Sequence, residues 1–216
     1  MYSVKRKNLH FALTSLSLLI LLAGCATYKV GGEVQRGRME LLYGDPNVAL
    51  GYFQHAAQLD PNYRLNYSIF PEGVWTYVGQ ANFAAGRIPE ARKALERART
   101  REDDDLAKVY LGLVLARSGD YDRGLREIEA GLRGINEWYD YIQFYHVDGQ
   151  FWDPGRRLRS SIQRELTSLS RRETNTNETV QNVALLGREI ELEIDRAKDH
   201  KDLYWQRRFH GDEMRR

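Results

Sequence analysis

Apolar residues recur along most of the chain at the three- and four-residue spacing of one face of an α-helix. Residues 154–172 alternate such an apolar face with arginines. Near the end of the chain, apolar or aromatic residues follow one another at seven-residue intervals: Val183, Ile190, Ala197 and Tyr204. No segment shows the alternating β-branched pattern of a strand, so we expect little or no sheet. The pattern therefore predicts an all-α protein.

The first 24 residues differ from the rest of the chain. A basic start at residues 5–7 precedes an apolar run from Phe11 to Ala23, which is the order of an export signal. Three hydroxyl residues interrupt the run, which is shorter than the ~20 apolar residues that a membrane-spanning helix needs. A retained membrane span is therefore the weaker interpretation.

The apolar run ends in Leu22-Ala23-Gly24-Cys25, which resembles the lipobox of bacterial lipoproteins. This resemblance implies diacylglycerol on the thiol of Cys25 and cleavage just before it. Ala26 follows instead of Asp, which under the enterobacterial sorting rule resembles lipoproteins sent to the outer membrane. We expect residues 1–24 to be removed and residues 25–32 to tether the protein to the periplasmic face of the outer membrane.

The net charge and the cysteine content limit which partners the protein can bind and how its fold can be stabilised. The formal net charge of +2 includes three basic and no acidic residues within 1–24, so the mature chain carries −1. This near-neutral balance predicts no nucleic-acid partner. Because the lipid uses the sole cysteine, no internal disulfide forms, and stability must come from packing.

Three segments repeat one spacing of small and large residues. The middle copy contains Trp75, Val78, Gly79, Gly86, Ala91, Leu95 and Ala98. The next copy, 33 residues later, contains Leu111, Gly112, Gly119, Gly124, Ile128 and Gly131. The upstream copy contains Gly37, Ala49, Phe53, Ala56 and Pro61. The pattern resembles the tetratricopeptide repeat (TPR) family, whose unit is a helical hairpin. The resemblance implies a solenoid of about three hairpins over residues 33–135, with additional C-terminal helices.

Small residues in this pattern should seat the helices closely. We expect Gly79 with Ala91, and Gly112 with Gly124, to let the two helices of a hairpin approach. Large residues should fill the space between hairpins: Phe53, Leu95 and Ile128. Gly86 and Gly119 are expected to end helices, and Asp45-Pro46 and Asp153-Pro154 to begin them.

In the TPR family, the first helices of the hairpins line a concave surface that binds partner proteins. Mapped by repeat position, that surface would consist of Arg38, Thr76, Gln80, Phe83, Val109, Leu113 and Arg117. The carboxylate clamp of the chaperone-tail-binding members is absent, because neutral residues occupy its positions. We therefore expect an extended or helical apolar segment of another envelope protein as the partner.

Two interpretations remain open for the aromatic-rich segment at the start of residues 136–172. Its rings are Trp138, Tyr139, Tyr141, Phe144, Tyr145, Phe151 and Trp152. We favour a cap over the open end of the solenoid. The alternative is a glycan- or lipid-binding surface that also uses the adjacent arginines. A long C-terminal helix within residues 173–216 is expected to pack back on the repeats, because Glu193 and Lys201 interrupt a coiled-coil seam.

Catalytic patterns are weak in this sequence. The histidines do not pair at metal-ligand spacing, and there is no phosphate-binding loop or nucleophile elbow. His146 with Asp148, and Asp199 with His200, could act as base and orienting acid, but such neighbours are more often solvated charges. We predict a non-enzymatic protein with no catalytic residues, no metal site and no cofactor besides the lipid on Cys25. Its predicted function is a periplasmic scaffold in the assembly of outer-membrane proteins, pili or secretion machinery.

Overall fold

The computed structural model describes residues 28–65, 72–100, 104–171 and 176–210. Within these ranges the chain forms helices and an isolated antiparallel bridge between Arg64 and Gly73. The all-α prediction is therefore confirmed for the described part of the chain. None of the helices in these ranges is both long enough and apolar enough to cross a bilayer. The predicted export signal and Cys25 lie outside the described residues.

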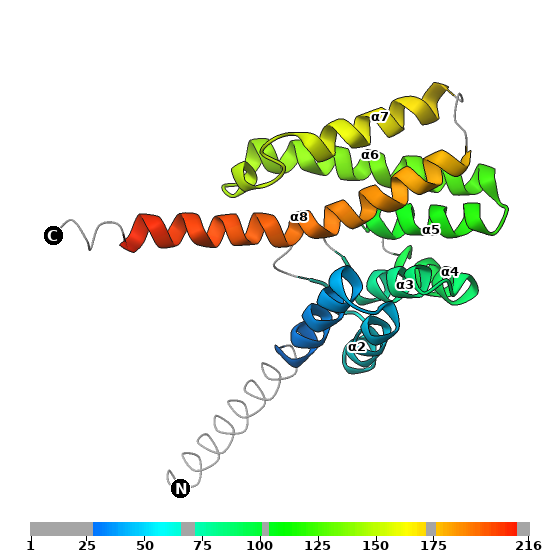
Figure 1. Ribbon diagram of the computed structural model, residues 1–216, viewed down its shortest axis with the longest axis horizontal. Coiled ribbons are helices and arrows are strands. Elements are labelled where there is room, and N and C mark those ends of the chain that lie inside the picture. Colours follow the sequence, from blue (N-terminus) through cyan, green and yellow to red (C-terminus); the bar gives the residue numbers. More distant parts are fainter. Residues whose placement is uncertain (1–27, 66–71, 101–103, 172–175, 211–216) are drawn as a thin grey trace, which may run out of the picture.

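The helices follow one another as antiparallel hairpins (Figure 1). In chain order they are residues 28–43, α2 (Pro46–Leu59), α3 (Val74–Ala84), α4 (Ile88–Ala98), α5 (Asp105–Arg117), α6 (Tyr121–Tyr145), the 3₁₀ helix η1 (Gly149–Phe151), α7 (Arg157–Arg171) and α8 (Thr176–His210). Neighbouring hairpins touch through α2 with α3 and through α4 with α5. The helix α6 runs without interruption through residue 136, where the aromatic-rich segment begins.

Capping residues and glycines in the sequence determine where several of these helices begin and end. The side chain of Asp45 accepts a hydrogen bond from the Asn47 N–H at 2.8 Å, and Pro46 occupies the first turn of α2. Gly86 and Gly119 follow α3 and α5 with φ angles of 75° and 89°, a region in which a side chain is strained. The predicted start of α2 and the two predicted glycine stops are therefore confirmed.

The helices α5 and α6 approach each other closely at two glycines. A Cβ atom added to Gly112 would lie 2.5 Å from the Gly124 carbonyl oxygen, and one added to Gly124 would lie 2.7 Å from the Gly112 oxygen. The two backbones are therefore in direct contact, as the sequence predicts.

The large residues of the repeats pack only partly as predicted. Phe53, Leu95 and Ile128 each lie against a glycine on the first helix of their own hairpin: Gly37, Gly79 and Gly112 respectively. They fill the space within hairpins, where the expectation was the space between them. The Phe53 ring also reaches the next hairpin, since it stacks on Tyr77 with centroids 5.1 Å apart.

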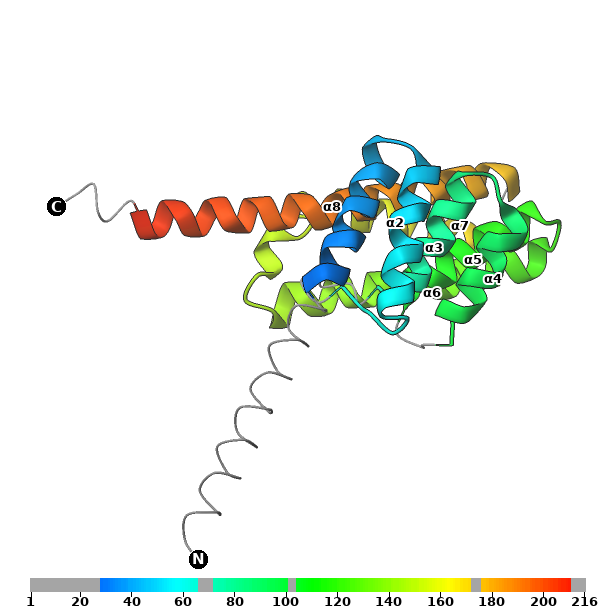
Figure 2. The ribbon, with the colours of Figure 1, turned by 90° about the horizontal axis from the view of Figure 1, so that it is seen from below.

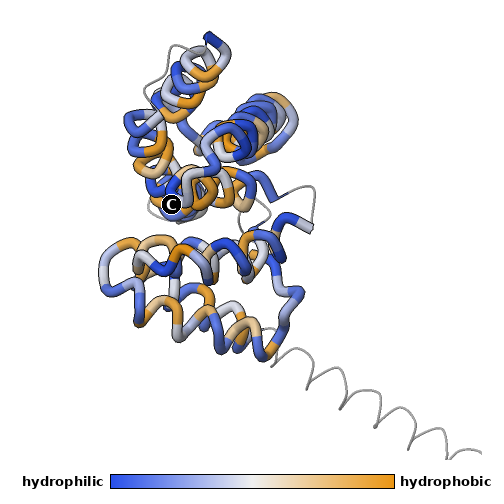
Figure 3. Tube along the Cα trace, turned by 90° about the vertical axis from the view of Figure 1, so that its right-hand side faces the viewer, coloured by the Kyte–Doolittle hydropathy of each residue, from blue (hydrophilic) through white to orange (hydrophobic). Residues whose placement is uncertain are grey.

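The helix α8 closes the array. It runs back across the hairpins, and its C-terminal end projects beyond them (Figures 1 and 2). Val183, Ile190 and Ile194 are buried in the same core as the facing residues of α5 and α6. Figure 3 shows apolar and polar residues mixed along the helices, as amphipathic packing requires. The helices α3 and α5 differ, because most of their residues are buried. The prediction that the C-terminal helix packs back on the repeats is confirmed.

Replacing Gly112 with Ala would force a methyl group into the backbone of α6. We expect the free energy of unfolding to fall by about 1–3 kcal/mol, measured by urea denaturation. Gly51→Ala in α2 is the matched control, because nothing lies within 4 Å of the added Cβ; there we expect a gain of about 0.5–1 kcal/mol. Equal effects of the two substitutions would contradict the close helix contact.

Candidate functional site

The predicted partner groove is not an open surface. Six of its seven residues are buried within the chain: Arg38, Thr76, Gln80, Phe83, Val109 and Leu113. The seventh, Arg117, is exposed and lies over the Phe83 ring at 4.1 Å. The prediction of an open groove is therefore wrong for six of the seven residues. Some of these residues are buried by the hairpins themselves, as when Val109 packs against Gly131. Others are covered by α8.

An ion-pair cluster joins α8 to the helix over residues 28–43. The Nε of Arg38 donates to Glu191 at 3.3 Å, its Nη1 donates to Asp195 at 2.7 Å, and its Nη2 donates to the Glu191 carbonyl at 3.0 Å. Gln80 of α3 donates to the other Glu191 carboxylate oxygen at 3.0 Å. Arg38, Gln80 and Glu191 are all buried, so removing one partner would leave an uncompensated polar group inside the protein.

A second carboxyl group faces this cluster. Glu72 is buried beside Glu191 and Tyr77, and burial, followed by the charge of Glu191, raises the pKa of Glu72 well above its usual range. Asp104 adds to the increase, while Arg38 opposes it. Glu72 therefore keeps its proton to a higher pH than an exposed glutamate does.

Asp104 explains why Thr76 is buried. Its carboxylate accepts hydrogen bonds from the Thr76 hydroxyl, from the Gly73 N–H at 3.1 Å and from the Ala107 N–H at 3.0 Å. Burial raises the pKa of Asp104, and these three bonds partly offset the increase. Asp104 thus caps α5 and ties it to α3, so the role of Thr76 is structural.

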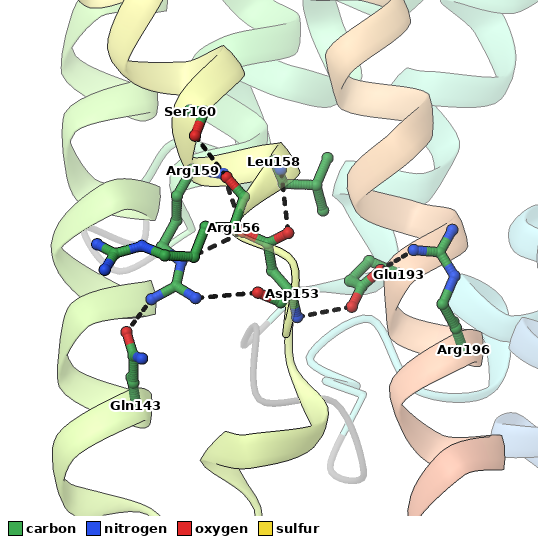
Figure 4. Close-up of polar contacts among 8 residues, drawn as sticks. All are labelled: Gln143, Asp153, Arg156, Leu158, Arg159, Ser160, Glu193 and Arg196. Carbon is green, nitrogen blue, oxygen red and sulfur yellow. Dashed lines mark hydrogen bonds and ion pairs between the residues drawn. The ribbon is translucent and has the colours of Figure 1, made fainter.

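A second buried polar cluster lies on the other side of α8 (Figure 4). Asp153 sits between Arg159 of α7 and Glu193 of α8: its carboxylate accepts from the Arg159 Nε at 3.2 Å, and its N–H donates to Glu193 at 2.7 Å. Arg159 also donates to Gln143 of α6, and Glu193 pairs with Arg196. Glu193, which breaks the coiled-coil pattern in the sequence, is therefore a buried link between α8 and the α6–α7 connection.

The prediction that Asp153-Pro154 begins a helix is wrong. The chain turns at Asp153, whose φ is 42°, and α7 starts at Arg157. The Asp153 carboxylate still accepts the N–H groups of Leu158 and Arg159, at 3.1 and 3.0 Å. Asp153 thus caps the helix from a turn, four residues before the first residue of α7.

The aromatic segment divides into a buried face and an exposed face. Tyr139 and Trp152 are buried in the core with α7 and α8, which agrees with the capping interpretation. On the opposite face of α6, Trp138 stacks on Tyr141 and Tyr141 stacks on Tyr145, with centroids 5.0 and 5.3 Å apart. The exposed apolar side chains here are Tyr141 (49% exposed), Phe144 (78%), Tyr145 (77%) and Val147 (79%). We call these four residues the aromatic end.

The histidine–aspartate pair near this end does not form a catalytic dyad. The Asp148 carboxylate binds Lys201 at 2.7 Å, and the Asp148 backbone N–H donates to His146 Nδ1 at 3.2 Å. The carboxylate therefore does not orient the imidazole. Across the described ranges, no three His, Cys, Asp or Glu side chains converge as metal ligands would.

The arginines of α7 have separate roles. Arg159 is buried against Asp153, whereas Arg157, Arg164 and Arg171 line an open depression of about 630 Å³ together with serine and threonine hydroxyl groups. Arg157 also pairs with Glu189 of α8 at 3.0 Å. The exposed arginines form a basic stripe along the outside of the molecule.

Comparison with known proteins finds no matching protein family, no matching curated protein and no matching solved structure.

Glu72 should make the free energy of unfolding depend on pH, and this dependence can be measured. Because the folded pKa of Glu72 is raised, the unfolded chain loses this proton first, and the free energy of unfolding falls as the pH rises from about 4.5 through the folded value. We expect Glu72→Gln, which cannot ionise, to reduce this fall and to be more stable than the parent protein at pH 8. Urea denaturation between pH 5 and pH 8 measures both effects.

The matched control for this test is Glu137→Gln, on the exposed side of α6. It should leave the pH-dependence of stability unchanged. If the Glu72→Gln and parent curves are parallel, Glu72 does not carry its proton in the folded protein.

Proposed function

We propose that the protein is a lipid-anchored scaffold of the bacterial envelope that holds a partner protein close to the membrane. The sequence from Leu22 to Cys25 supports the anchor, and the hairpin spacing within residues 33–135 supports a protein-binding array. The described chain begins at Tyr28, three residues after Cys25. A lipid on Cys25 would therefore hold the array within about 11 Å of the lipidated residue.

The observation that carries this proposal is the C-terminal end of α8, which projects beyond the array (Figure 1). Residues of α8 up to Ala197 contribute to the core. Beyond them, Leu203 is 49% exposed, and Tyr204 is 38% exposed and packs its ring against Phe151 with centroids 5.4 Å apart. A projecting helix with apolar side chains can enter a groove of another protein or pair with its helix. We assign partner docking to this end, because α8 itself covers part of the predicted groove.

Leu203→Glu tests the docking segment. In the intact lipoprotein purified from its native membrane, we expect partner recovery to fall at least about fivefold, because a charge would have to enter an apolar contact. Quantitative mass spectrometry after cross-linking measures the recovery.

The control for this docking test is Leu185→Glu, which changes a still more exposed leucine of α8 (65% against 49% for Leu203) that lies alongside the array. It should leave partner recovery unchanged. The docking assignment is wrong if both variants lose the partner equally or if neither loses it.

The anchor is tested separately with Cys25→Ser. We expect this variant to incorporate no alkyne-labelled fatty acid during growth, since no other thiol exists in the chain, while Leu203→Glu incorporates it normally. Undiminished labelling of Cys25→Ser would remove the lipid anchor from the proposal.

A further inference from the structure

The aromatic end concentrates exposed apolar side chains within seven residues. Phe144, Tyr145 and Val147 each expose more than three quarters of their surface. Apart from the neighbours Leu203 and Tyr204, the other exposed large hydrophobic residues of the described ranges are more scattered along the sequence, such as Tyr43, Val48, Tyr121 and Leu185. Scattered single residues are normal on a protein surface, whereas a cluster of this kind indicates an interaction site.

Folding does not require these side chains. The inward face of the same stretch is already formed by Tyr139 and Ile142, which are 1% and 0% exposed. The helix end is also fixed from two sides, by Arg159 bonding to Gln143 and by Lys201 bonding to Asp148 at 2.7 Å. The cluster is therefore presented on a firmly held support.

The chemistry of the cluster favours a bilayer over a sugar. Tyr141 and Tyr145 combine an apolar ring with a hydroxyl group, which is typical of side chains at the membrane–water interface. Phe144 and Val147 carry no hydrogen-bonding group in their side chains, so they offer nothing to the hydroxyl groups of a glycan. They match the acyl region just below the headgroups.

The position of the cluster also favours the bilayer. The start of the helix over residues 28–43 and the end of α6 lie toward the same end of the long axis, the end from which α8 projects (Figures 1 and 2). Cys25 precedes Tyr28 by three residues, and Tyr28 itself is 87% exposed. A lipid on Cys25 would thus place a membrane at this end of the molecule.

We propose that the aromatic end inserts into the interface of the bilayer that carries the lipid anchor, and so fixes the orientation of the helical array on the membrane. The identity of that bilayer rests on the proposed anchor. The insertion itself is a property of the surface, so the unlipidated chain retains it.

The experiment uses the chain from Ala26 onward, which keeps every described residue and lacks the lipid. This protein is sedimented with vesicles of phosphatidylethanolamine and phosphatidylcholine. We expect a vesicle-bound fraction that high salt does not reduce, because the contact is apolar. The double variant Phe144→Ser/Tyr145→Ser should bind at least about tenfold more weakly, since two exposed rings no longer enter the interface.

The matched control is Tyr121→Ser at the opposite end of α6, about 36 Å away along the helix. Tyr121 is 47% exposed, and its replacement should leave vesicle binding unchanged. Because all three substituted side chains are exposed, the thermal melting temperatures should equal that of the parent, which excludes unfolding as the cause of lost binding.

Several results would overturn the proposal. These are no vesicle binding by the parent chain, equal binding by the double variant, and binding that high salt abolishes, which would assign the contact to the arginines of α7. Retention on isolated peptidoglycan but not on vesicles would assign the rings to a glycan. Fatty-acid labelling of Cys25 in cells is independent of all these measurements, so failure of the anchor and failure of the insertion are distinguishable.

Discussion

The architecture depends on two carboxylates of α8 that reach in different directions. Glu191 and Glu193 are two residues apart and therefore point about 200° apart around the helix axis. Glu191 binds Arg38 and Gln80 of the N-terminal hairpins, while Glu193 binds the backbone of Asp153 in the α6–α7 connection. Apolar residues between them, such as Ile190 and Ile194, fill the core. This single helix thus joins both halves of the array.

Such buried charges fix geometry more than they add stability. Removing Arg38 or Glu191 from water is costly, and their mutual attraction offsets the cost only with good hydrogen-bond geometry. Apolar contacts are not directional, so by themselves they restrict a shift of a helix along its axis less strictly than ion pairs do. Because Arg38 must meet both Glu191 and Asp195, such a shift would leave charges unpaired, and one register of α8 is selected.

Local patterns predicted the helical class, the contact of Gly112 with Gly124 and the return of α8, since each depends on spacing within a short segment. The burial of the predicted groove residues was not predictable in this way, because Arg38 and Glu191 are 153 residues apart in sequence. The high density of aromatic residues in the segment that follows residue 136 was also, by itself, a misleading signal. Helical phase separates the buried pair Tyr139 and Ile142 from the exposed pair Tyr141 and Tyr145, and applying it to residues 136–147 would have found the aromatic end.

The unequal lengths of α5 and α6 constrain how the array could change in evolution. α6 has 25 residues against 13 in α5, so it overhangs its partner by about 18 Å. A further hairpin of ordinary length added after α6 would meet the overhang and the 3₁₀ connection rather than a matching helical surface. Duplication could lengthen the array only upstream of α5, and α8 would then need additional turns to span it. The number of hairpins and the length of the C-terminal helix should therefore vary together.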